Sequence, residues 1–91
     1  MKTAKQIERY FKGGANHRRI EILLLAAERP NMTVAGITEE LKGNFKTISE
    51  HTRRLVQAGL LNKAYQGRSV AHTISPYGQR FVNFIKTFQH S

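Results

Sequence analysis

The chain has 91 residues and no cysteine, and its 15 Lys and Arg against 6 Asp and Glu give a formal net charge of +9. This length fits one domain with a modest core, and the lack of cysteine excludes disulfides and thiolate metal ligands and favours a cytoplasmic location. No apolar run reaches the roughly 18 to 20 residues that span a bilayer, so we expect no membrane partner. The positive surplus suits a polyanion, because neutralising phosphates releases condensed counterions.

The first third of the chain predicts two helices. A short helix is expected over residues 3–11, ended by the pair Gly13 and Gly14, since glycine disfavours helical conformation. Asn16 is placed to cap a second helix over residues 17–28. The run IEILLLAA within it is apolar on more than one face, which predicts the central buried helix of the domain.

A helix-turn-helix is predicted next, over about residues 33–58. Thr33 can cap a third helix that runs through Leu41. Gly43 and Asn44 supply a tight turn, and the side chain of Asn44 can cap the helix that follows.

The fourth helix, over residues 45–58, has two contrasting faces on a 3.6-residue period. Its apolar side carries Ile48, Thr52, Leu55 and Val56. The opposite arc carries Lys46, Glu50, Arg53, Arg54 and Gln57. Residues 42–68 hold six basic residues and one acidic residue, a net charge of +5, which is more than half of the excess. This pattern is typical of a DNA recognition helix, although a solvated surface helix would show the same alternation.

A β-hairpin follows, because Val70, His72 and Ile74 alternate with other side chains as in a half-buried strand. Gly67 lies between the two predicted strands, where a tight turn needs positive φ. The expected wing covers about residues 61–75.

The last predicted helix covers about residues 76–89, with Ser75 as its cap and Pro76 at its first position. Its apolar stripe holds Tyr77, Phe81, Phe84, Ile85 and Phe88. One small core does not easily cover this stripe, so part of it is expected to pack against a second copy together with Ile7, Tyr10 and Phe11.

The order of elements, mainly α with about five helices and a two-stranded wing, resembles the winged helix-turn-helix repressors of the ArsR family. The resemblance covers about residues 16–89, and the whole chain is expected to form a single domain. Its most specific part is Thr47-Ile48-Ser49-Glu50-His51, then Leu55, Ala58-Gly59-Leu60 and the wing pair Gly67-Arg68.

The resemblance implies a homodimer that represses transcription, with the fourth helix in the major groove of double-stranded DNA and the wing near the flanking groove or backbone. The residues that would face DNA are Lys46, Thr47, Ser49, Glu50, Arg53, Arg54 and Arg68. The helical wheel supports four of them independently, whereas Thr47 and Ser49 depend on the resemblance.

The chain departs from the family at several positions. Metal-sensing members carry paired cysteines in the third helix, where this chain has none, so we expect no metal and no cofactor. Only His90 near the chain end would offer a ligand in the last helix, and four scattered histidines do not form a metal site. Glu50 stands where a base is often found and Thr52 where leucine is usual; Glu50 could accept a hydrogen bond from cytosine N4.

Two other binding functions remain open at this point. A winged helix can serve as a protein–protein interaction module, and a basic wing can bind RNA. An enzyme is disfavoured, since no nucleophile–base pair, carboxylate pair or phosphate loop stands out. The sequence identifies neither the operator nor an effector.

Overall fold

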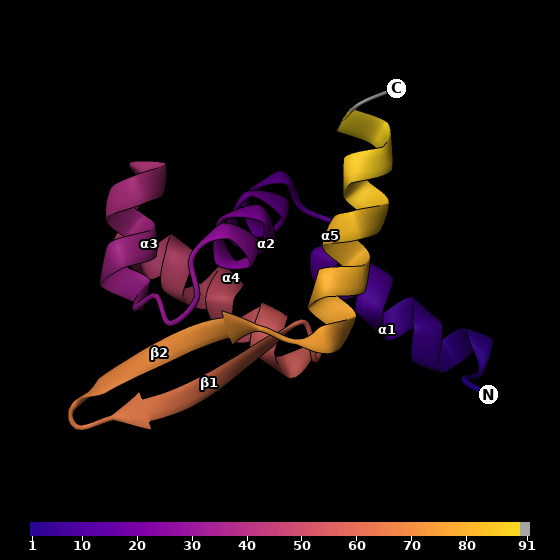
Figure 1. Cartoon of the computed structure of the whole chain (residues 1–91). Helices are drawn as coiled ribbons and strands as arrows, with labels where there is room; N and C mark the ends of the chain where they lie inside the picture. Colours follow the sequence, from indigo (N-terminus) through magenta and orange to yellow (C-terminus); the bar gives the residue numbers. More distant parts are fainter. Residues whose placement is uncertain (90–91) are drawn as a thin grey trace.

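The computed structural model describes residues 1–89 as five helices and one antiparallel hairpin. His90, named above as a candidate ligand in the last helix, lies outside the described residues. The elements are α1 (Ala4–Gly14), α2 (His17–Glu28), α3 (Val34–Leu41), α4 (Phe45–Gln57), β1 (Leu61–Gln66), β2 (Ser69–Ile74) and α5 (Pro76–Gln89). The hairpin projects from the helices as a wing, and α1 and α5 lie together at the opposite side of the molecule (Figure 1).

Local capping signals set most helix starts. The side chains of Asn16, Thr33 and Asn44 each accept a hydrogen bond from a backbone N–H in the first turn of the helix that follows. Ser75 does the same for α5 through a 2.9 Å bond from the Gly78 N–H. All four predicted caps are therefore confirmed, because each satisfies a donor that the helix leaves unpaired.

The prediction that Gly13 and Gly14 end the first helix is wrong, since α1 runs from Ala4 through Gly14. Both glycines are buried inside the helix. A Cβ on Gly13 would lie 2.2 Å from the Cβ of Ala58, and one on Gly14 would lie 2.5 Å from the ring of Phe81. The pair lets α1 approach α4 and α5 closely, and this benefit outweighs the low helix propensity of glycine.

The turn between α3 and α4 has its left-handed residue at Lys42, with φ 51°, one position before the expected Gly43. After α4 the chain turns at Gly59, whose φ of 81° is a backbone conformation that glycine adopts without strain. These two turns fix how α4 crosses the domain.

The core forms around α2, which packs against α1, α3, α4, α5 and β2, so its predicted central position is confirmed. Side chains with at most 1% exposure come from six segments and are Ile22, Leu23, Ile37, Ile48, Thr52, Leu55, Leu60, Leu61 and Val82. This core fixes one side of α4 and leaves its opposite side in solvent.

The wing is a two-stranded antiparallel sheet in which Lys63 pairs with His72, and Gly67 turns the chain at φ 64°. The expected half-buried alternation in β2 is only partly right, because Ala71 and His72 are both buried, at 2% and 5% exposure. The backbone of Met32 exchanges two hydrogen bonds with that of His72, at 3.2 and 2.7 Å, and this added pairing covers the base of the wing.

Candidate nucleic-acid interface

The solvent-facing side of α4 carries most of the residues predicted to meet DNA. Lys46, Thr47, Glu50, Arg53 and Arg54 are exposed, and Ser49 is half-buried. The opposite side inserts Ile48, Thr52 and Leu55 into the core. A rigidly seated helix therefore presents long cationic side chains in one arc.

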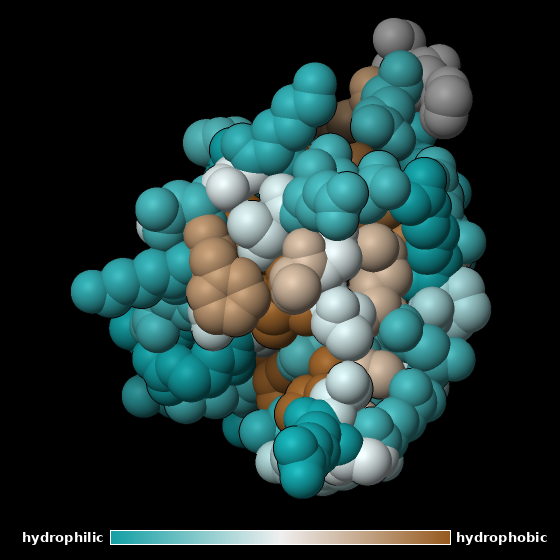
Figure 2. Space-filling model, turned by 90° about the vertical axis from the view of Figure 1, so that its left-hand side faces the viewer, coloured by the Kyte–Doolittle hydropathy of each residue, from teal (hydrophilic) through white to brown (hydrophobic). Residues whose placement is uncertain are grey.

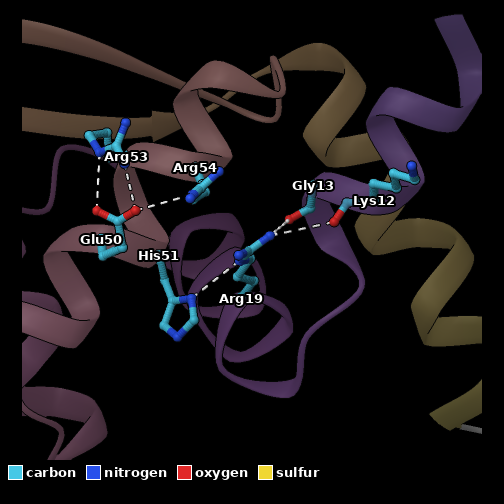
Figure 3. A network of polar contacts seen from close by, with 7 residues as sticks. All are labelled: Lys12, Gly13, Arg19, Glu50, His51, Arg53 and Arg54. Atoms are coloured by element: carbon cyan, nitrogen blue, oxygen red, sulfur yellow. Dashed lines mark hydrogen bonds and ion pairs between the residues drawn. The ribbon is translucent and has the colours of Figure 1, made fainter.

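Glu50 joins both arginines of this arc (Figure 3). Arg53 donates to the carboxylate from Nε at 3.2 Å and from Nη2 at 2.5 Å, and Arg54 Nε donates at 3.1 Å. The hydrogen bonds from Arg53, followed by those from Arg54, lower the pKa of Glu50 below its ordinary value despite some desolvation. The two arginines thus share one anchor, although their side chains leave the helix about 100° apart.

Arg68 lies in the exposed turn at the far end of the wing, beside Gly67. The wing runs beside α4, since Ser69 and Val70 of β2 share a hollow with Phe45 at the start of α4, and Arg68 directly precedes Ser69 in the chain.

A second basic region, which the sequence pattern does not predict, lies between α1 and α4. Arg9, Lys12, Arg19 and Arg54 surround a shallow hollow of about 260 Å³. Basic residues on three separate helices meet here only because Gly13 packs on Ala58, and no local signal indicates that contact.

Arg19 links the same region to the recognition helix (Figure 3). Its Nε donates to His51 Nδ1 at 3.2 Å, and its Nη1 donates to the Gly13 carbonyl at 3.3 Å and to the Lys12 carbonyl at 3.5 Å. Burial, and then the nearby charge of Arg19, lower the pKa of His51. His51 therefore has a hydrogen-bond partner within the protein, on a neighbouring helix.

The described residues 1–89 contain no group of three or more His, Cys, Asp or Glu side chains placed to hold a metal ion. Within the same residues, no helix combines the length and the apolar character needed to cross a membrane.

The predicted dimer residues gather on one face of α1 and α5. Aromatic contacts join the two helices, with ring centroids 4.9 Å apart for Tyr10 and Tyr77 and 5.8 Å apart for Phe11 and Phe81. Five of the predicted residues remain substantially exposed, between 39% and 67%: Ile7, Phe11, Tyr77, Phe84 and Phe88. Phe81, Tyr10 and Ile85 are half-buried. The apolar patch lies away from the wing.

A helix-turn-helix followed by a hairpin, with an exposed basic second helix, defines the winged helix-turn-helix class of DNA-binding domains. Residues 16–63 match the bacterial regulatory proteins of the arsR family. This match covers more than half of the chain, which therefore belongs to the ArsR family of DNA-binding transcriptional regulators. No curated protein sequence matches the chain.

Solved structures show the same fold. HlyU from Vibrio cholerae is 20% identical, with a TM-score of 0.85 over 97% of this chain and 96% of its own. The homodimeric winged helix-turn-helix DNA-binding domain of a possible ArsR-family regulator from Mycobacterium bovis is 25% identical, with a TM-score of 0.84 over 94% of this chain and 80% of its own. The predicted fold class and family are thereby confirmed.

Proposed function

We propose that the protein is a homodimeric repressor that acts in the cytoplasm and binds a roughly palindromic operator, with no catalytic role. Each α4 would enter a major groove, and the two half-sites would lie about one helical turn apart. The residues proposed to face DNA are Lys46, Thr47, Ser49, Glu50, Arg53, Arg54 and, from the wing, Arg68. The observation that carries this proposal is the exposed cationic arc of α4 on a buried helical base.

Charge and shape support duplex DNA over the alternatives. The arc on α4 presents cations along a helix, which fits a groove, and the polar contacts at Glu50 hold the arginines side by side. Single-stranded RNA is bound mainly through exposed aromatic stacking platforms. Among the described residues of α4 and the wing, the exposed aromatic side chains are Phe45 and Tyr65, which come from two different elements.

The proposed dimer would form through the apolar patch of α1 and α5. Phe84 is 49% exposed and Phe88 67% exposed, which is unusual for phenylalanine unless a partner covers it. The Mycobacterium bovis domain, whose fold this chain shares, is homodimeric, which supports a dimer here as well. A second copy would bury the patch and set the spacing of the two recognition helices.

Selection of bound duplexes from a random pool, followed by salt titration of the winner, tests the proposal. A palindromic consensus is expected, with the binding constant falling steeply as salt rises, by about 0.9 in log–log slope for each phosphate neutralised. Replacement of Arg53 and Arg54 by alanine should abolish selection. The single variants Arg53→Ala and Arg54→Ala are compared with Lys86→Ala, which also removes one positive charge and lies in the last turn of α5, far from the wing (Figure 1). Absence of a consensus, with affinity unaffected by the arginine changes, would favour a protein–protein module.

A further inference from the structure

A groove of about 430 Å³ separates α4 from the wing and is bordered by the start of α3. We call it the wing groove. Figure 2 shows the face that carries α3 and the wing tip, where hydrophobic residues lie in a recess behind a largely hydrophilic rim. Its volume lies at the small end of the range that binds small molecules. The groove therefore suits a compact ligand.

The groove wall combines an apolar part with cations. Three valines, Val34, Val56 and Val70, contribute the apolar part, and Arg53 and Lys63 contribute the charge. None of the described residues that line it is acidic. Charge and polarity thus match a small anion that has an apolar body.

His72 adds an unmet hydrogen-bonding group to this wall. Its side chain is buried, and none of residues 1–89 is within hydrogen-bonding geometry of its Nδ1. Such a group normally finds a partner, because an unpaired buried polar atom is costly. Since Nδ1 is also screened from solvent, the ring must turn before a ligand in the groove can satisfy it. Lys63 pairs with His72 across the hairpin, so the cation and the imidazole stand side by side on the same face.

From these observations we propose that the wing groove binds a small organic carboxylate with an aromatic or branched apolar body, and that this binding weakens DNA binding. The ligand carboxylate would pair with Lys63 and compete with Glu50 for the guanidinium of Arg53, and the apolar body would lie against the valines. The second half of the proposal rests on the proposed function, because Arg53 is also a proposed DNA contact. A ligand anion and a DNA phosphate would then compete for one guanidinium, and each would lower the affinity of the other by the same factor.

Thr52 offers a way to test the wing groove by substitution. Thr52 lines the groove, and its hydroxyl donates to the Ile48 carbonyl within α4 at 2.8 Å. Thr52 is almost fully buried, so a larger leucine side chain at this position should reduce the volume of the groove. Thr52→Leu is therefore a substitution that fills the proposed site without touching the exposed arc of α4.

The first experiment uses the full-length protein without DNA and benzoate as the probe. Amide NMR shifts should map to the wing groove, with a Kd on the order of 1–10 mM, as expected for so small a ligand. Lys63→Gln should weaken binding by about three- to tenfold, as expected for loss of a charged contact. Arg68→Gln, the same charge change on the same hairpin, should leave binding unchanged. Benzyl alcohol and benzylamine are the neutral and cationic controls.

Thr52→Leu should abolish the benzoate shifts, and Val70→Phe, at a partly exposed position, provides the same test if the first variant fails to fold. The proposed site would be refuted if benzoate caused no shifts in the native protein, or if benzyl alcohol and benzylamine caused equal shifts. It would also be refuted if the Thr52→Leu and Val70→Phe proteins both bound benzoate as well as the native protein does.

The second experiment adds benzoate to the complex with the selected duplex. Operator affinity should fall as benzoate saturates the protein, and the Thr52→Leu protein should bind the duplex without this response. Benzoate binding that leaves operator affinity unchanged would overturn the coupling. Benzoate binding in a protein that selects no duplex would support the site and contradict the proposed repressor function, so the two failures are distinguishable.

Discussion

The Nε of Arg19 in α2 donates a 3.2 Å hydrogen bond to Nδ1 of His51 in α4, and the same guanidinium reaches the carbonyls that end α1. One side chain therefore connects the helix of the apolar patch to the recognition helix. The bond requires an unprotonated Nδ1, since an imidazolium has no lone pair to accept it.

This bond makes stability depend on pH. Burial and Arg19 lower the pKa of His51 from its ordinary 6.5, and burial lowers that of His72 in the same direction. At a pH just below the ordinary histidine pKa, these two side chains are therefore more protonated in the unfolded chain than in the folded protein. The free energy of unfolding should fall as pH drops from about 7 to about 5.5, because protons bind preferentially to the unfolded chain. Above about pH 7 both histidines are neutral in the folded and the unfolded chain, and their contribution to the free energy of unfolding is fully present. Urea denaturation at successive pH values measures it.

His51→Gln is the control for this pH dependence. The amide oxygen of glutamine can accept the Arg19 hydrogen bond and does not titrate, so the pH slope should become shallower, and the remainder should include His72. Glu50 has a lowered pKa and loses its contribution only further into acid, outside this window. An identical slope in both proteins would contradict the assigned role of His51.

Gly13 tests the packing of α1 on α4. Alanine normally favours a helix by about 1 kcal/mol over glycine, but here its Cβ would meet Ala58 at 2.2 Å. Because α1 must move, Gly13→Ala should destabilise the fold by about 1–3 kcal/mol in urea denaturation. Gly36→Ala in α3 is the matched control: its nearest neighbour would be the Thr33 hydroxyl at 3.4 Å, so it should be neutral or stabilising. Equal behaviour of the two variants would refute the close contact.

The apolar patch of α1 and α5 predicts self-association. Phe84→Glu places a charge among exposed aromatic rings and should shift the protein from dimer to monomer in sedimentation velocity. Tyr65→Glu is the control, because Tyr65 is 72% exposed on the wing, away from the patch, and its replacement should leave the dimer intact. A native protein that sediments as a monomer at high concentration would remove the proposed interface.

Sequence patterns predicted the elements whose signals are local. Asn16, Thr33 and Asn44 cap the helices they were expected to cap, and Gly67 turns the wing. Each of these features depends on a few neighbouring residues. The apolar period of α4 likewise predicted which side enters the core, because a helix imposes that geometry without help from the rest of the chain.

Features that depend on distant partners were not predictable in the same way. A pair of adjacent glycines such as Gly13 and Gly14 usually indicates the end of a helix. Here the pair lies within α1, and the reason is its close packing against Ala58 and Phe81, which are distant in the sequence. The hydrogen bond between Arg19 and His51 joins positions 32 residues apart. The wing groove requires three elements at once. Glu50 is different, because its spacing of three and four residues from Arg53 and Arg54 is a local pattern that by itself predicts ion pairs within the helix.

Glu50 should restrain the DNA affinity of α4. Its carboxylate holds Arg53 at 2.5 Å and Arg54 at 3.1 Å, and it would place a negative charge near DNA phosphates. Glu50→Gln should therefore raise affinity for random duplex several-fold and steepen the salt dependence by about one unit of log–log slope. Discrimination between operator and random duplex should fall, because arginines without a fixed anchor contact phosphate indiscriminately. Fluorescence anisotropy with both duplexes over a salt series measures all three quantities.

The matched control for this change is Glu40→Gln, which removes one negative charge from an exposed ion pair with Arg29 and lies outside α4. Net charge is then the same in both variants, and only Glu50→Gln alters the arc. If both raise affinity equally, the effect comes from overall charge and Glu50 does not organise the arginines. If Glu50→Gln instead weakens operator binding while leaving random duplex unchanged, the carboxylate contacts a base directly, as an acceptor for cytosine N4 would.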